Sequence, residues 1–449
     1  MTLALIVLAV VLVLAIKGFS DPFMAFLAFV TNYELQPGEL YPPLGFLHLE
    51  RILLAFVVIS FVMNRSRLRF PPITKKFLAF YAVMLIATPF GFWLSNSLQF
   101  DMAFFEVVVY HVLLVSLLTS EERLRKYLLL YVGLIAWIGA SSLYEYHAGV
   151  RVVTMGIERA EGLTSAGGDP DTLAITMSIT IPFAFLLMGK GASKAVRIYG
   201  LIVLAIYLAT IIDTGSRNAF LALIVCLFIS VFQRRKNWKF LPVVLVALPL
   251  LWMVIPQQYK ARYESIETRD QDESYTNRLL SWQGGVKMFL HNPVTGVGPD
   301  NYTFANGMKY WPGNPRHWLN AHSLYFKFLG ELGILGILSF FTYLVAVIRM
   351  NWKLARRLKK EKFDPILQNF PFACNVSLYL LLFTGYAAHN NYRSTWYTLG
   401  AMTAALALLK PAQETSPATD TAKPVRLPAW VPVKKSPEVQ QDEPQTAIA

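Results

Sequence analysis

The stretch Asn320–Gly336, NAHSLYFKFLGELGILG, combines the features of a membrane helix with titratable side chains. Its glycines recur at every third position, which puts them on one helix face where a second helix can approach closely. Lys327 and Glu331 lie at i and i+4, a spacing at which they can pair with each other. His322 stands near the start, preceded by Asn320 as the expected N-cap. The stretch therefore predicts a membrane helix that begins at a surface carrying a histidine.

The composition extends this prediction to the whole chain. Of 449 residues, 55% are hydrophobic and only 15% are charged. Apolar segments long enough to cross a bilayer, roughly 17 to 25 residues each, recur from end to end. The expected fold is an all-α polytopic membrane protein with about 12 transmembrane helices, because such helices satisfy their own backbone hydrogen bonds. The expected spans lie near residues 2–17, 18–32, 48–63, 77–97, 103–118, 125–143, 172–188, 196–212, 218–233, 239–255, 322–349, 370–387 and 394–410.

The positive charge sets the expected topology. The formal net charge is +13, but Lys and Arg gather in short segments between apolar runs, which is typical of topology signals and not of a nucleic-acid-binding surface. If all these clusters face the cytoplasm, the spans alternate consistently. The clusters are residues 64–76, 122–126, 190–197, 234–239 and 353–362. The external segments are then 33–47, 98–102, 144–171, 213–217, 256–321 and 388–393.

Two regions differ from the regular alternation. We expect residues 1–410 to form the transmembrane domain, which includes a large external loop at 256–321 with short amphipathic helices. Loops of that length usually carry function or structure of their own. Residues 411–449 are rich in Pro, Ala, Gln and Thr without helical periodicity, and we expect a disordered cytoplasmic tail.

Arginines in the external segments run against the usual charge bias and therefore need a reason. Arg217 ends a short turn between two apolar spans. Arg278 lies on an expected amphipathic helix whose apolar side chains include Trp282, and Arg159 lies in the loop 144–171. Each could simply reach lipid phosphates, and Asp213 could pair with Arg217. Several arginines that converge instead suit a diphosphate, because the guanidinium binds phosphate oxygens in a bidentate manner.

His322 is the candidate proton acceptor. Imidazole titrates near neutrality, so it can take a proton from a hydroxyl nucleophile without a large change in pKa. The alternative is a helix-terminus histidine that only hydrogen-bonds to its neighbours. His317 and His389 are competitors on the same side of the membrane and, with Arg159, are candidate helpers.

These residues resemble a known family. His322, Ser323, Gly333 and Gly336 fit a histidine motif associated with bacterial O-antigen ligases, and the turn at Arg217 and the segment 277–302 look like the wider O-antigen ligase and polymerase superfamily. The resemblance implies an inverting glycosyltransferase that works at the periplasmic face without metal or cofactor. The donor would be a glycan on undecaprenyl diphosphate, and the acceptor would be lipid A-core.

The resemblance also implies roles for individual residues. Arg217 and Arg278 would hold the diphosphate, and His322 would be the catalytic residue at the acceptor hydroxyl. An O-antigen or exopolysaccharide polymerase and a protein O-oligosaccharyltransferase share this donor and stay as alternatives. A secondary transporter ranks below them, because no inverted repeat is evident and the external loop is lopsided.

Overall fold

The described part of the chain folds into a helical bundle with one small β-hairpin. The computed structural model describes residues 2–154, 156–165, 167–232, 273–313, 317–388 and 390–411, and a few isolated positions between 233 and 272. The residues up to Pro411 belong to one compact unit. The predicted span 239–255 and the predicted tail lie almost wholly outside the described residues, so both stay predictions.

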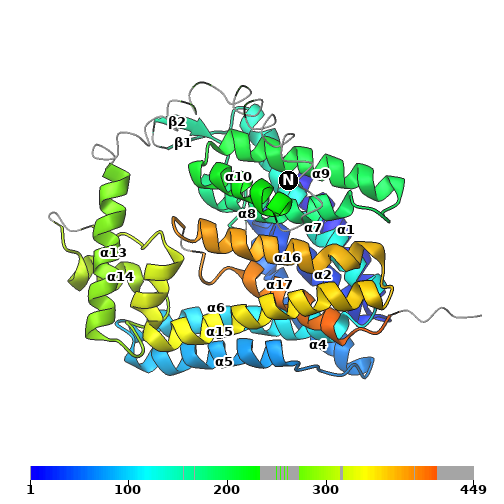
Figure 1. The fold of residues 1–449 in the computed structure, drawn as a ribbon, viewed down its shortest axis with the longest axis horizontal. Coiled ribbons are helices and arrows are strands. Elements are labelled where there is room, and N and C mark those ends of the chain that lie inside the picture. The colour runs from blue at the N-terminus through cyan, green and yellow to red at the C-terminus, as the bar shows by residue number, and fades with distance from the viewer. Residues whose placement is uncertain are drawn as a thin grey trace, which may run out of the picture. The chain divides into compact units, whose positions relative to one another are not determined.

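Helices account for nearly all regular structure in the described part of the chain (Figure 1). The α-helices are α1 (Thr2–Gly18), α2 (Pro22–Leu35), α3 (Pro37–Leu40), α4 (Leu49–Met63), α5 (Pro72–Ala87), α6 (Leu94–Leu117), α7 (Glu121–His147), α8 (Pro170–Leu187), α9 (Lys194–Thr214), α10 (Arg217–Phe232), α13 (Glu273–His291), α14 (Tyr302–Ala305), α15 (Leu324–Lys360), α16 (Pro365–Thr384) and α17 (Ser394–Leu408). Short irregular helices are η1 (Pro42–Leu47), η2 (Thr88–Phe90) and η5 (Asn306–Tyr310).

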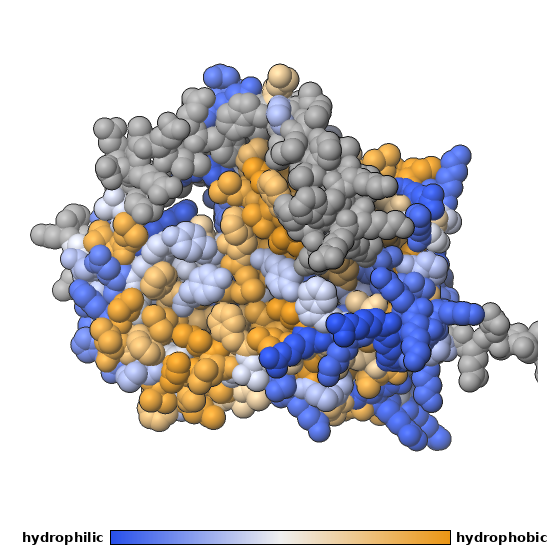
Figure 2. All heavy atoms as spheres, in the orientation of Figure 1, coloured by the Kyte–Doolittle hydropathy of each residue, from blue (hydrophilic) through white to orange (hydrophobic). Residues whose placement is uncertain are grey.

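The expected all-α membrane fold is confirmed. Among the described residues, seven helices are long and apolar enough to cross a membrane: α5 with η2, α6, α7, α8, α9, α15 and α16. Large apolar side chains such as Val13, Leu201 and Leu338 are more than half exposed, as expected for helices that face lipid. Figure 2 shows apolar residues across much of one face, with hydrophilic residues gathered at one end of the view.

α8 and α15 are central elements of the packing. α8 packs against α7, α9, α10 and α16, while α15 packs against α5, α13, α16 and α17. The start of α8 is fixed by its sequence: Pro170 occupies the first turn, and the Asp169 carboxylate accepts hydrogen bonds from Asp171 N (2.9 Å) and Thr172 N (3.2 Å). This capped end of α8 contributes to the site described below.

Four of the five basic clusters lie at the same end of the bundle, and the fifth lies outside the described residues. Arg125 in the cluster 122–126 pairs with Asp364 at 3.5 Å, just after the cluster 353–362. Gly191 in the third cluster packs against Pro365. Arg69 N in the cluster 64–76 donates to Ser116 Oγ (3.0 Å) at the end of α6. This arrangement is the one that the charge pattern predicts.

One boundary and one loop differ from the sequence prediction. The break expected at 98–102 lies at 88–93, because Pro89 and Gly91 end α5 while the apolar residues around them hide the turn from a hydropathy reading. The loop 144–171 also contains strands, β1 (Val152–Thr154) and β2 (Ile157–Arg159), which pair antiparallel with Val152 opposite Arg159.

The long helix of the opening stretch is broken at Gly333. Its φ of 58° and ψ of −152° interrupt α15, so the helical hydrogen bonds on both sides are replaced by bonds to the loop after α13. Val297 N and Gly298 N donate to the carbonyls of Gly330 (2.8 Å) and Glu331 (2.9 Å), and Ile334 N donates to Pro293 O (2.9 Å). The glycine face thus receives a loop backbone in addition to helix α13, whereas the sequence predicted only a second helix.

Candidate functional site

A cavity of about 780 Å³ opens among α2, α7, α8, α10, α13 and the two segments that precede α15 and α17. Arg217, Arg278 and His322, the three residues predicted to bind the diphosphate and act on the acceptor, all line it. They come from three segments that are separated by more than forty residues in the sequence. The fold therefore brings the predicted site together.

Arg217 is positioned by the turn between α9 and α10. Gly215 ends α9 in the left-handed region (φ 58°), and its N–H donates to Ile212 O (3.0 Å). Ser216 Oγ then donates to Asp171 Oδ1 (2.5 Å), which ties the turn to the start of α8. Asp213, in the same turn, pairs with His147 Nε2 at 3.1 Å. The turn is thus fixed directly before the residue that it presents.

α13 carries Arg278 and also holds the segment that carries His322. Trp282 Nε1 donates to Ala321 O (2.8 Å), and Ser281 Oγ donates to Asn320 O (3.1 Å). The structure has a helix at the predicted position, but the apolar side chains of Leu279 and Val286 on it are more than one third exposed. Side chains of the helix that carries Arg278 therefore hold the main chain directly before His322.

His322 precedes α15 in an uncommon backbone conformation. Its φ is 44°, in the left-handed region, and Ser323 is the N-cap of α15, so the prediction that Asn320 caps this helix is wrong. Asn320 Oδ1 instead accepts from Ala321 N (2.9 Å). Burial lowers the pKa of His322, and the positive charge of Arg278 lowers it further, while Asp169 and Asp171 oppose this change. The imidazole is therefore neutral at neutral pH and can accept a proton.

Lys327 and Glu331 form the predicted ion pair, with 3.7 Å between Lys327 Nζ and Glu331 Oε1. Glu331 is fully buried and also accepts from Tyr302 N (3.1 Å) and Tyr392 OH (2.8 Å). Lys327 has a second partner, Asp300 Oδ1, at 3.4 Å, and both residues of this second pair line the cavity. Through the bond from Tyr392 to Glu331, the Lys327–Glu331 pair links the start of α15 to the segment before α17.

The two candidate helpers that the structure describes lie outside the cavity lining. Arg159 is buried and lies outside the cavity lining, where Nε donates to Thr214 O (2.5 Å) and Nη2 pairs with Asp171 Oδ1 (2.9 Å). His317 also lies outside the lining, beside the ring of Trp311. His389 lies outside the described residues.

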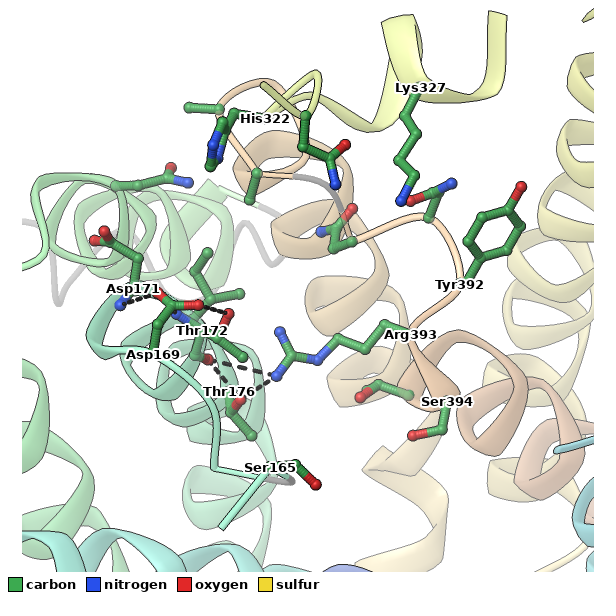
Figure 3. A pocket seen from close by; sticks show the side chains of 18 of the residues that line it. Ser165, Asp169, Asp171, Thr172, Thr176, His322, Lys327, Tyr392, Arg393 and Ser394 are labelled. Carbon is green, nitrogen blue, oxygen red and sulfur yellow. Dashed lines mark hydrogen bonds between the residues drawn. The ribbon is translucent and has the colours of Figure 1, made fainter. Parts of the chain in front are cut away.

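The sequence reading missed Arg393, which lines the cavity directly before α17. Its guanidinium donates to Thr176 Oγ1 and to Thr172 O (3.4 Å), and Figure 3 shows it reaching across the site toward α8. Burial lowers the pKa of Arg393, and the negative charges of Glu34 and Asp169 oppose this change. The signal was available, because Arg393 lies in the predicted external segment 388–393 and breaks the same charge bias as Arg217.

A comparison with protein families finds one that covers the core of this site. The family described as O-antigen ligase matches residues 202–341, from α9 to α15. The predicted resemblance to the O-antigen ligase and polymerase superfamily is confirmed over this segment. The O-antigen ligase match includes Arg217, Arg278 and His322, and it supports a glycosyltransferase-type membrane enzyme. No curated protein matches the chain.

Proposed function

We propose that this protein transfers a glycan from undecaprenyl diphosphate to an acceptor hydroxyl, as an O-antigen ligase that acts on lipid A-core. The observation that carries the proposal is the convergence of Arg217, Arg278 and His322 in one cavity. Two guanidinium groups beside a neutral imidazole suit a reaction in which a diphosphate leaves and a hydroxyl loses its proton.

The proposed reaction makes use of the charged groups in the cavity. The acceptor oxygen attacks the anomeric carbon as the bond from that carbon to the diphosphate oxygen breaks, and His322 takes the hydroxyl proton. Attack from the side opposite the diphosphate inverts the anomeric carbon. Arg217 and Arg278 stabilise the negative charge that develops on the leaving diphosphate, which is worth most in a partly dry site. A diphosphate leaves as a stable anion, so the proposal requires neither a metal ion nor a general acid.

The proposed orientation places the cavity at the periplasmic face of the inner membrane. The cavity is lined by the predicted external segments, including residues 213–217 and 388–393. The cluster 353–362 and the start of α16 lie at the other end of α15 and α16 from these segments. Because basic residues favour the cytoplasmic side, this distribution supports a periplasmic site.

His322→Ala tests the catalytic role directly. We expect glycan transfer to be lost while the amount of protein in the membrane is unchanged. His317→Ala is the matched control, because it removes an imidazole five residues earlier that lies outside the cavity lining. Normal glycan display in cells that carry His322→Ala would contradict the mechanism.

The deletion phenotype tests the acceptor. Loss of a ligase leaves long glycan chains on undecaprenyl diphosphate, whereas loss of a polymerase leaves single repeat units on the acceptor. Loss of a protein O-oligosaccharyltransferase leaves the surface polysaccharide intact and removes glycan from proteins. Accumulation of long lipid-linked chains is the result that the proposal expects.

A further inference from the structure

The segment before α17 contains buried polar atoms that lack a partner. Asn391 is 1% exposed and lines the cavity, and neither its Oδ1 nor its Nδ2 has a hydrogen-bond partner among the described residues. Asn390 also lines the cavity, and its Oδ1 is likewise buried without a partner in the described part of the chain. Buried amide groups in folded proteins are nearly always paired, so these three atoms need an explanation.

The backbone of this segment is held firmly. Trp396 Nε1 donates to Asn390 O (2.8 Å), and Tyr397 OH donates to Asn391 O (3.2 Å). Both aromatic side chains are fully buried in the core. The next residue, Tyr392, donates its hydroxyl to Glu331. The segment is therefore fixed on both sides of Asn391, and its unpaired amide is not explained by a loosely packed loop.

The amides are set apart from the cationic groups of the site by their chemistry. A carboxamide is uncharged and offers both donor and acceptor atoms, which match the hydroxyl and acetamido groups of a sugar. A phosphate would offer only acceptors, and two of the three unpaired atoms here are acceptors themselves. A lipid tail would leave all three atoms unpaired. The ligand that satisfies them is therefore a polar group that donates as well as accepts.

We propose that Asn390 and Asn391 form a sugar-binding subsite of the cavity, distinct from the arginines that hold the diphosphate. This inference rests on the proposed function, because the sugar would belong to the lipid-linked donor or to the acceptor saccharide. Arg393, two residues after Asn391, lines the same cavity. Its side chain points toward Thr172 and Thr176 on the facing helix α8 (Figure 3). The subsite selects a glycosylated ligand over a bare diphosphate.

Direct binding to purified full-length protein tests this subsite. The probes are undecaprenyl diphosphate alone and undecaprenyl diphosphate that carries N-acetylglucosamine. We expect Asn391→Leu to weaken binding of the glycosylated probe about tenfold or more, the effect of one or two lost hydrogen bonds, and to leave binding of the bare probe unchanged. Arg217→Lys should weaken binding of both probes. Asn391→Ala, which removes the amide and adds no bulk, should reproduce the result.

Thermal unfolding separates recognition from a structural role. Asn391→Leu removes two unpaired polar atoms, so its Tm should equal or exceed that of the wild type. Asn351→Leu is the matched control, because Asn351 is equally buried but donates to Asn375 Oδ1 (2.9 Å) and accepts from Thr403 Oγ1 (3.0 Å) outside the cavity. That variant should lower Tm without changing the preference for the glycosylated probe.

The outcomes distinguish the sources of the sugar and the two proposals. If the Asn391 variants lose binding of the glycosylated probe and keep binding of the bare probe, the subsite belongs to the donor. Unchanged binding of both probes with a raised KM for the acceptor saccharide assigns it to the acceptor. Unchanged binding together with an unchanged KM in both Asn391 variants overturns the subsite alone. Failure of the wild-type protein to bind undecaprenyl diphosphate overturns the proposed function and the subsite that rests on it.

Discussion

Gly333→Ala is the substitution by which the broken helix can be tested most directly. The φ of 58° and ψ of −152° at this position lie in a region that is essentially limited to glycine, and a side chain there costs about 1–3 kcal/mol. A Cβ at Gly333 would also lie 2.7 Å from Pro293 O and from the carbonyl carbon of Val294. Backbone atoms cannot give way as a flexible side chain can, so the loop must move.

The cost of moving the loop follows from its hydrogen bonds. Two bonds run from the loop to the carbonyls of Gly330 and Glu331, and two run from Ile334 and Leu335 back to the loop. Each contributes about 0.5–1.5 kcal/mol, so loss of two of them adds about 1–3 kcal/mol to the backbone strain. We expect Gly333→Ala to lower the free energy of unfolding by about 2–6 kcal/mol.

Thermal unfolding of purified protein measures this effect, and glycan transfer in cells measures its consequence. Transfer should fall because the displaced loop leads to Asp300, the cavity partner of Lys327. Leu338→Ala is the control, since this residue lies in the same helix with its side chain 58% exposed. A Gly333→Ala protein with the Tm and transfer activity of the wild type would refute the account of the helix break.

Three further substitutions or conditions test the site. Burial and Arg278 lower the pKa of His322, so the neutral imidazole persists below pH 6.5. The acidic limb of the kcat/KM profile should therefore lie below that value. A limb above pH 6.5 would contradict the assignment of His322 as the proton acceptor. Arg278→Gln removes one of the charges that lower the pKa of His322, so the acidic limb of the residual activity should move to higher pH. An unchanged limb would show that Arg278 and His322 do not interact. Arg159→Gln breaks the bonds to Thr214 O and Asp171 and should reduce the free energy of unfolding by about 1–3 kcal/mol. Thermal unfolding measures this effect, and a wild-type Tm would show that these bonds add nothing to stability.

The sequence predicted the fold class and the gathering of the site because a bilayer imposes simple rules. Apolar length gives the helices, and basic residues indicate which ends share a side of the membrane. The charge bias drew attention to the external arginines, and the resemblance to the O-antigen ligase family assigned roles to Arg217, Arg278 and His322. The structure brings all three to one cavity. No contact between them had to be known for that prediction.

The rules failed where structure depends on a partner elsewhere in the chain. The break at Gly333 is stabilised by a loop about forty residues earlier, and nothing in the local pattern distinguishes it from a glycine that packs against a helix. The sequence also could not predict that the amide of Asn391 is buried without a partner among the described residues. Both features are properties of tertiary packing.

Arg159 and Arg393 show the limit of the charge rule most clearly. Both lie in predicted external segments, but the rule says only at which end of the bundle a side chain lies, not in which direction it points. Arg393 lines the cavity, whereas Arg159 is buried against Thr214 O and pairs with Asp171. Asp171 also accepts from Ser216, the residue before Arg217. Arg159 therefore stabilises the turn that presents Arg217, and it acts through the shape of the site without facing a ligand.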